Sequence, residues 1–385
     1  MKVSAEILNL VPYKPGKPIS ETQREFGLKE VIKLASNENP LGPSPRAVKA
    51  IQEHLASQHR YPDPVGYELV HKISDKWKVP VSQIALGNGS NEIIDLLIRI
   101  FCEPGDAILT SEAAFVAYQV CAQAARVRVR TTPLRSDLTI DLKSIADYFF
   151  QHPNSRVRLI FIPNPNNPTG TLVGGSELEN FLIRLGNRDD VLLVFDEAYT
   201  EYVRDAQFKE AAQFYKEYSN VLVLKTFSKV YGMAGLRLGA LLAPEYVLEF
   251  YNRVRNPFNV NDLAQVAGIA ALDDQDYVKA SQKVVWDGLD YFYQELKRLR
   301  LPYFKSQANF VLFDTLRDVD EVNLNLLKKG IILRPVQNYG FKTLMRMTVG
   351  QMDENKKAIQ AIEKMLSEVA ALPNHKPAFK GEGEF

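Results

Sequence analysis

The sequence contains little cysteine or histidine, with two cysteines and five histidines among 385 residues. Cys102 and Cys121 both stand in apolar surroundings, and neither takes part in a spacing typical of metal ligands. This pattern predicts buried free thiols in a reducing compartment and no metal site.

The sequence also lacks an excess of either charge, because Lys and Arg number 47, Asp and Glu number 46, and the net charge is +1. A nucleic-acid-binding protein is expected to carry a basic excess, so nucleic acid is not a predicted partner. No apolar run approaches the roughly 18–20 residues that a membrane span needs. The N-terminal residues have no continuous apolar stretch of the signal-peptide kind. The predicted location is the cytoplasm, without a membrane partner.

A chain of 385 residues is longer than one compact core usually supports, so two domains are expected. Short apolar segments alternate with amphipathic segments between residues 84 and 243. The apolar segments lie at residues 107–109, 157–162, 191–195, 221–224 and 238–242. The alternation predicts an α/β fold with a mostly parallel central sheet covered by helices on both faces.

The predicted organisation has four parts. Residues 1–35 form an extended arm with a short strand at 31–34 that contributes to the small domain, and residues 36–255 form the large domain. Residues 256–372 form a long helical region and a smaller α+β domain, with strands at 310–313, 331–334 and 344–349. Residues 373–385 are expected to be disordered.

Two predicted helices have start signals. Ser44 caps the first, and Pro45 lies in its first turn. Ser176 and Glu179 predict a capping box for a helix over residues 176–185.

Two turns rich in glycine or proline follow predicted strands. In LGNGSNE (residues 86–92) Ser90 opens a helix, whose free N–H groups suit a phosphate. In NPNNPTG (residues 164–170) the chain path is fixed so that a side-chain amide stands above the sheet, where it can donate to a phenolate-like oxygen. Taken alone, each segment could be an ordinary structural turn.

Two further segments place reactive side chains after buried strands. Asp196 and Glu197 follow the apolar run VLLVF. Paired carboxylates can indicate a metal site or acid–base chemistry, but no phosphate-binding lysine loop precedes them, and a carboxylate opposite a cationic ring nitrogen fits better. The segment KTFSKVYGMAGLRLG (residues 225–239) supplies hydroxyl groups, the Lys229 amine and the Arg237 guanidinium. Each of these could separately be a capping or surface residue.

The four segments lie at the carboxyl ends of strands, where open α/β sheets bind ligands. Pyridoxal phosphate needs a lysine for its aldehyde, donors for its phenolic oxygen, a carboxylate for its ring nitrogen, and cationic and hydroxyl groups for its phosphate. Successive strand–helix units of this sequence supply each of these groups. The set therefore predicts a pyridoxal-phosphate enzyme with the cofactor on Lys229.

The same motifs resemble the fold-type I aminotransferases and, more narrowly, the histidinol-phosphate aminotransferase branch. The resemblance covers nearly the whole chain, through PYKPGKP, LASNENPLGPSP, RYPD, LGNGSNE, NPNNPTG, DEAY, TFSK with AGLRLG, PFNVNDLAQ, ANFVLF, ILRP and MRMTVG. It implies a large domain with a mostly parallel central sheet and a smaller α+β domain. The implied activity is transfer of an amino group from histidinol phosphate to 2-oxoglutarate, with glutamate as the product.

The resemblance also implies residue roles. Lys229 would form the Schiff base and shuttle a proton, and Asp196 would pair with the ring nitrogen. Asn167 and Tyr199 would bond the phenolic oxygen, and Phe115 would stack on the ring. The phosphate would be held by Ser90, Asn91, Thr226, Ser228 and Arg237, and by Tyr61 from the partner subunit of a homodimer with shared sites.

Substrate binding would fall to Arg346, Arg334 and Tyr13. Arg346 matches the arginine that receives a carboxylate in aminotransferases, and its guanidinium can also bind a phosphate with two hydrogen bonds. Arg334 and Tyr13 match positions that assist the substrate phosphate. As alternatives, Arg334 could form an ion pair between domains, and Tyr13 could only pack the arm.

Three other functions remain open from the sequence. Aromatic amino-acid aminotransferases of the same branch share the motifs, and a threonine-phosphate decarboxylase is built on similar ones. Transcription regulators use similar domains to bind ligands, but they carry an N-terminal DNA-binding domain, and only the short arm precedes the fold in this sequence.

Overall fold

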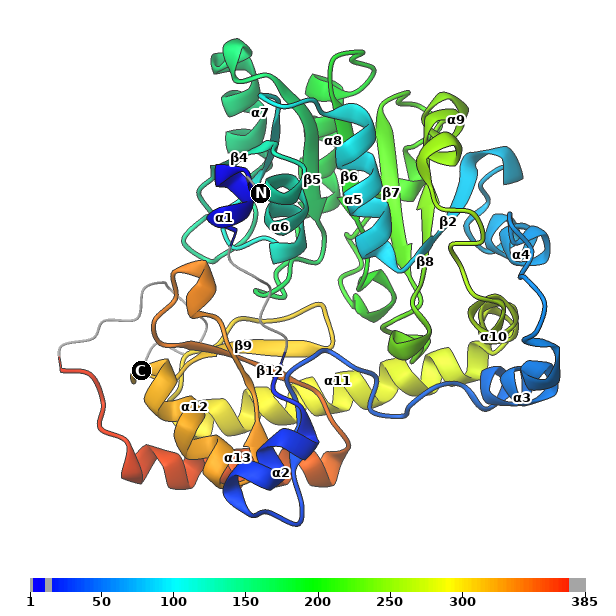
Figure 1. Cartoon of the computed structure of the whole chain (residues 1–385). Helices are drawn as coiled ribbons and strands as arrows, with labels where there is room; N and C mark the ends of the chain where they lie inside the picture. The colour runs from blue at the N-terminus through cyan, green and yellow to red at the C-terminus, as the bar shows by residue number, and fades with distance from the viewer. Residues whose placement is uncertain (1–2, 11–15, 374–385) are drawn as a thin grey trace.

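A computed structural model describes residues 3–10 and 16–373. A large α/β unit lies above a smaller α+β unit, and the long helix α11 runs beneath the large unit into the smaller one (Figure 1). At about 1.5 Å per residue, the 24 residues of α11 span about 36 Å.

The large unit is built on a seven-stranded sheet with strand order β2-β8-β7-β6-β5-β3-β4. Only β8 pairs antiparallel with its neighbours, and the other pairs are parallel, as the predicted α/β class requires. The strands are β2 (Ile84–Asn88), β3 (Ala107–Ser111), β4 (Arg128–Thr132), β5 (Val157–Pro163), β6 (Leu192–Asp196), β7 (Val221–Thr226) and β8 (Leu238–Leu242).

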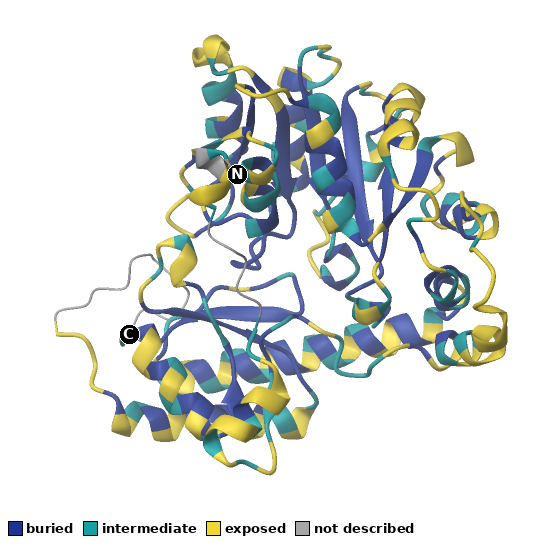
Figure 2. Cartoon of the chain, viewed as in Figure 1, coloured by how far each residue is buried: buried dark blue, intermediate teal, exposed yellow. Residues whose placement is uncertain are grey.

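Helices cover both faces of this sheet, so its central strands are almost wholly buried (Figure 2). Alternate residues face opposite cores: Leu222 and Leu224 pack in one, and Val221 and Val223 pack in the other. The helices of this unit are α3 (Pro45–His54), α4 (Tyr67–Trp77), α5 (Ser90–Phe101), α6 (Val116–Ala124), α7 (Leu142–Gln151), α8 (Gly175–Leu185), α9 (Glu245–Val254) and α10 (Asp262–Leu272).

The smaller unit contains a three-stranded antiparallel sheet in the order β11-β12-β9 and a two-stranded parallel sheet of β1 and β10. Its strands are β1 (Ile32–Lys33), β9 (Phe310–Asp314), β10 (Ile331–Ile332), β11 (Arg334–Pro335) and β12 (Leu344–Thr348). Its helices are α2 (Ile19–Phe26), α11 (Gln275–Arg298), α12 (Val319–Lys328) and α13 (Met352–Glu368), and a short helix α1 (Ala5–Leu8) packs near α6.

Several expected details were wrong. The arm is not simply extended, because α2 forms after Pro18 and ends at Gly27, whose φ of +67° suits glycine. The strand expected at 331–334 is two strands, because the chain leaves β1 at Leu333 and then joins β12 in the other sheet.

The two expected helix starts had different outcomes. The Ser44 hydroxyl accepts the backbone N–H groups of Arg46 and Ala47, which confirms the predicted cap. The capping box at Ser176 was wrong, because α8 starts one residue earlier, at Gly175, with Gly174 in the cap position and no side-chain cap.

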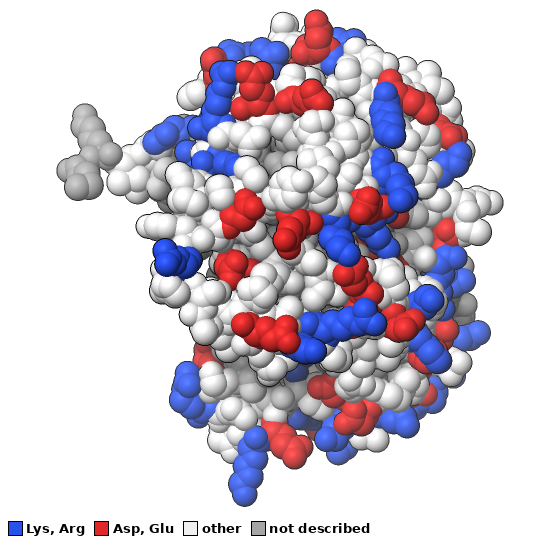
Figure 3. Space-filling view, turned by 90° about the vertical axis from the view of Figure 1, so that its right-hand side faces the viewer, with Lys and Arg blue, Asp and Glu red and all other residues white. Residues whose placement is uncertain are grey.

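The domain limits at residues 35, 255 and 372 stay predictions, and the expected disordered tail lies outside the described residues except for its first residue, Pro373. No helix in the described ranges combines the length and apolar character needed to cross a membrane. On the face that Figure 3 presents, positive and negative side chains are interspersed, and neither sign forms a continuous patch there.

Candidate active site

A cavity of about 370 Å³ lies between the large sheet and the three-stranded sheet. Its walls come from the carboxyl ends of β5, β6 and β7, the start of α5, the helix α6, and the strands β11 and β12. Most of the residues predicted for the site line it together: Ser90, Asn91, Phe115, Asn167, Asp196, Tyr199, Thr226, Ser228, Lys229, Arg237, Arg334 and Arg346.

Asp196 ends β6 inside the large unit and is only 5% exposed. Its Oδ2 accepts a 2.7 Å hydrogen bond from the Tyr118 hydroxyl on α6, whereas its Oδ1 is buried without a hydrogen-bond partner among the described residues. Burial raises the pKa of the Asp196 carboxyl, and the Tyr118 hydrogen bond, the backbone N–H of Ala198 and the charge of Lys229 oppose this rise. A buried carboxylate with one unpartnered oxygen is suited to receive a cationic N–H group.

Tyr199 lies near Asp196, after the turn that ends β6. Its hydroxyl accepts a 2.9 Å hydrogen bond from Nδ2 of Asn37. Asn37 is itself fixed by Thr348 on β12, through two contacts of 3.0 Å. Burial raises the pKa of Tyr199 to about 12, opposed by the charge of Arg346 and the Asn37 hydrogen bond. The hydroxyl therefore keeps its proton at neutral pH and can act as a donor within the site.

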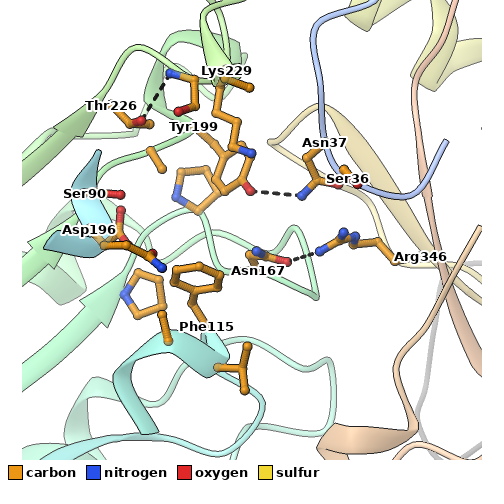
Figure 4. Close-up of a pocket in the computed structure, with 18 of the residues that line it drawn as sticks. Ser36, Asn37, Ser90, Phe115, Asn167, Asp196, Tyr199, Thr226, Lys229 and Arg346 are labelled. Carbon is orange, nitrogen blue, oxygen red and sulfur yellow. Dashed lines mark hydrogen bonds between the residues drawn. The ribbon is translucent and has the colours of Figure 1, made fainter. Parts of the chain in front are cut away.

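Asn167 is oriented from the opposite side of the cavity. Its Oδ1 accepts a short hydrogen bond from Arg346 Nη1, as Figure 4 shows. Arg346 also donates to the carbonyl oxygen of Ala35 at 2.7 Å, and its guanidinium lies 5.1 Å from the ring centroid of Phe310. Because a guanidinium has only donors, the Asn167 oxygen must face Arg346, and the amide N–H₂ is left as the donor on its other branch.

The start of α5 and the segment after β7 form a cradle for an anion. Gly89 precedes α5 with φ +76°, and a Cβ built there would lie 2.4 Å from Arg237 Nη2. A Cβ on Gly239 would lie 2.7 Å from the backbone nitrogen of Ser90. Backbone N–H groups, hydroxyl groups of Thr226 and Ser228, and a guanidinium thus meet where a helix begins, which is a suitable environment for phosphate.

Lys229 follows β7 and extends into the cavity beside Tyr199 (Figure 4). Its Nζ lies 5.6 Å from the centroid of the Tyr199 ring. The cavity therefore holds an amine, donors for a phenolic oxygen, an unpartnered buried carboxylate oxygen and an anion cradle. These are the groups that pyridoxal phosphate requires, so the residues present fit this cofactor. Nowhere in residues 3–10 and 16–373 do three His, Cys, Asp or Glu side chains cluster as they would to hold a metal ion.

One described residue that was predicted for the site is not among those that line the cavity. Tyr61 is 82% exposed and stacks on Phe258 with 4.6 Å between ring centroids. Its expected role requires the partner subunit, so this role stays a prediction. Tyr13 lies outside the described residues.

Sequence reasoning missed several residues that shape the site. Tyr118 lies on α6, three positions after Phe115 at the N-cap of that helix, and the two rings meet edge to face with 5.7 Å between centroids. Asn37 belongs to the SNENPLGPSP segment, which resembled the family without indicating which side chain matters. Ser36, Glu38, Cys121 and Tyr339 also line the cavity, and only the three-dimensional structure identifies them.

Comparisons with known proteins agree with this arrangement. Residues 29–362 match the sequence family described as aminotransferase class I and II. The chain is 57% identical over 372 residues to the histidinol-phosphate aminotransferase of Bdellovibrio bacteriovorus, covering 97% of this chain and 100% of that protein. It is 43% identical to the enzyme of the same name from Caldicellulosiruptor saccharolyticus, covering 94% and 99% of the two chains.

Two solved structures share the fold. The histidinol-phosphate aminotransferase of Clostridium acetobutylicum is 26% identical, with a TM-score of 0.80 over 88% of this chain and all of that one. The Sinorhizobium meliloti enzyme, solved in complex with pyridoxal 5'-phosphate, is 23% identical, with a TM-score of 0.85 over 96% of this chain and 98% of its own. The fold is thus the fold-type I architecture expected from the motifs. The chain belongs to the class I and II aminotransferases, in the branch of the histidinol-phosphate aminotransferases.

Proposed function

We propose that this enzyme transfers the amino group of histidinol phosphate to 2-oxoglutarate, in two successive half-reactions that use pyridoxal phosphate on Lys229. The observation that carries the substrate assignment is the position of two arginines. Arg334 on β11 and Arg346 on β12 are register partners in adjacent strands, and both line the cavity. Two guanidinium groups side by side suit a dianionic phosphate better than a neutral aromatic ring.

Each residue around the cavity has a separate role in the amino transfer. Bound pyridoxal phosphate supplies an electron sink that makes the proton on the substrate α-carbon removable. Asp196 would hold a proton on the ring nitrogen through its Oδ1, and Tyr199 and Asn167 would donate to the phenolic oxygen. The Lys229 amine would take the proton from the substrate α-carbon and deliver it to the cofactor carbon that carries the amino group.

We also propose a homodimer in which Tyr61 of each subunit reaches the phosphate cradle of the other. An exposed tyrosine stacked on a second exposed aromatic residue is common at protein interfaces. Sedimentation of the purified protein would measure the oligomeric state. Tyr61→Ala and Lys229→Ala variants, each with little activity alone, should regain activity when mixed, because a hybrid dimer contains one intact site. A predominantly monomeric enzyme with full activity would contradict this proposal.

The substrate is tested by mixing purified holoenzyme separately with histidinol phosphate and with phenylalanine in a stopped-flow spectrophotometer. Histidinol phosphate alone should rapidly replace the absorbance band of the aldehyde form of the cofactor with that of its amine form. Faster conversion by phenylalanine would overturn the assignment and place the enzyme among the aromatic amino-acid aminotransferases.

A further inference from the structure

A cluster of buried charges lies across the large sheet from the cavity, and none of its members has a role in the proposed transamination chemistry. Lys225 on β7 is 1% exposed, and its Nζ lies 2.7 Å from Glu197 Oε2 and 2.7 Å from Glu210 Oε2. Glu197 is 2% exposed, and its other oxygen accepts the backbone N–H of Ala211. An ion pair this deeply buried does not generally add stability over an apolar pair, so its presence calls for another explanation.

The cluster is joined to the cavity by strand geometry. Successive residues of a strand face opposite sides of the sheet. Asp196 and Thr226 line the cavity, so their neighbours Glu197 and Lys225 point to the other side. The last ladder contact between these strand ends is the 3.0 Å hydrogen bond from the backbone nitrogen of Glu197 to the carbonyl oxygen of Leu224. The ion pair therefore joins β6 and β7 immediately beyond the point where their backbone pairing ends.

Lys225 also contacts a second residue of the segment that begins at Glu197. Its Nζ donates to Thr200 Oγ1 at 3.3 Å. Glu197 and Thr200 flank Ala198 and Tyr199, which both line the cavity. One ammonium group thus fixes both ends of the short turn that carries Tyr199.

We infer that Lys225, through its contacts with Glu197 and Thr200, is a positioning residue for the proposed transamination. It holds the ends of β6 and β7 so that Asp196, Tyr199 and Thr226 keep the spacing that the cofactor requires. Lys225 is not among the residues that line the cavity. The inference rests on the proposed function for its cofactor but not for the identity of the substrate.

The test uses three variants of the full-length protein. Lys225→Met removes the ammonium and leaves Glu197 buried without its partner. Lys225→Met combined with Glu197→Gln removes the two fully buried charges, and water can solvate the remaining Glu210 carboxylate, whose side chain is 33% exposed. The double variant therefore decides the matter even where the single variant folds poorly. Lys225→Arg keeps the charge. The control is Lys72→Met, which breaks the exposed pair with Asp273 at 2.7 Å.

Three quantities are measured: the melting temperature of the cofactor-free protein, the dissociation constant of pyridoxal phosphate by equilibrium dialysis, and the kcat/KM of the holoenzyme. The double variant should melt near the wild-type temperature, yet bind the cofactor about tenfold more weakly and lose about 100-fold in kcat/KM, since small displacements of catalytic groups are costly. Lys225→Arg should recover most of both losses, and Lys72→Met should change neither.

A double variant with wild-type cofactor affinity and wild-type kcat/KM would overturn the inference and reduce the cluster to a folding element. Equal losses in Lys72→Met would overturn it too. The cofactor affinity requires no substrate, so a failure of histidinol phosphate as the amino donor would leave this test intact.

Discussion

The Tyr118 hydroxyl donates a 2.7 Å hydrogen bond to Oδ2 of the Asp196 carboxylate. The other carboxylate oxygen, Oδ1, is buried and has no hydrogen-bond partner among the described residues. Tyr118 is fully buried, and its ring stacks on Phe161 with 4.7 Å between centroids. Because the tyrosine cannot easily move, the direction in which Asp196 presents its remaining oxygen is fixed before a cofactor binds.

Tyr118→Phe should therefore weaken catalysis without removing any group that touches the substrate. The hydroxyl favours the charged form of Asp196, so its loss should raise the pKa of that carboxyl further, and the acid limb of kcat/KM should move to higher pH. Hydrogen bonds to charged groups contribute about 1.5–3 kcal/mol, so activity on that limb should fall about 10- to 100-fold. Tyr215→Phe removes a buried hydroxyl that has no partner among the described residues, and it should leave the profile unchanged. Identical profiles for all three proteins would refute the role of Tyr118.

Lys229→Ala should abolish covalent attachment of the cofactor. Borohydride reduction of the wild-type holoenzyme should label Lys229, and peptide mass spectrometry should find Lys225 unlabelled, because its amine is buried in ion pairs. The variant should retain no reducible label and should lose essentially all turnover. Label that persists in Lys229→Ala would assign the attachment to another lysine.

Arg334→Gln should separate the two amino substrates. If Arg334 receives the phosphate, its loss should raise KM for histidinol phosphate about 10- to 100-fold, since charge-assisted hydrogen bonds are the strong ones. The KM for glutamate should change much less, because Arg346 remains. Arg99→Gln, on the exposed side of α5, serves as the control. Equal increases in KM for both substrates would indicate that Arg334 shapes the pocket and does not bind the substrate phosphate.

Gly239→Ala should weaken cofactor binding by pushing on the phosphate cradle. The added Cβ would lie 2.7 Å from the backbone nitrogen of Ser90 and 2.8 Å from the carbonyl carbon of Gly89, and backbone atoms cannot rotate away. Overpacking typically costs about 1–3 kcal/mol, so the dissociation constant of pyridoxal phosphate should rise about 10- to 100-fold. In the control Gly235→Ala, the added Cβ has no neighbour within 4 Å, so this variant should bind the cofactor with normal affinity. Similar affinities in both variants would show that the cradle tolerates displacement.

Glu201 should make the fold less stable as the pH rises. Burial raises the pKa of this carboxyl from 4.5 to about 7, opposed by the charge of Lys225. Between those values the folded protein binds more protons than the unfolded chain, so this contribution to the unfolding free energy falls with rising pH and stays low above pH 7. Glu201→Gln removes the effect. Urea unfolding measures the unfolding free energy of both proteins. The difference between variant and wild type should shift in favour of the variant by about 1–3 kcal/mol from pH 5 to pH 8. The exposed substitution Glu53→Gln should show no such pH dependence, and a constant difference for Glu201→Gln would contradict the assignment.

Much of this site could be predicted from the sequence, because its chemistry lies in short segments that follow buried strands. Asp196, Thr226 and Lys229 come within a few residues of apolar runs, and strand periodicity places them at one edge of the sheet. The predicted fold class, enzyme family and pyridoxal-phosphate cofactor are confirmed by the family match and the related proteins.

Other features depended on contacts between distant segments. Asn37 orients the Tyr199 hydroxyl only because the fold brings Thr348 and Tyr199 next to it. No local sequence pattern predicts either contact. The strand β4 was missed because only one of its five residues is buried, so no apolar run marks it. β10 and β11 are separate strands because β10 pairs with β1 and β11 pairs with β12. This choice of partners is a property of the folded chain.

The hydrogen bond between Arg346 and Asn167 joins residues 179 positions apart, and the contacts between Asn37 and Thr348 join residues 311 positions apart. A ribosome releases the chain from its N-terminus, so every strand of the large sheet can emerge before β12 is made. A nascent chain stalled before Leu344 could bring Asp196 and Tyr118 together, yet the Asn167 amide and the Asn37 side chain would lack their anchors on β12. The order of synthesis thus delays a finished cofactor pocket until nearly the whole polypeptide has left the ribosome.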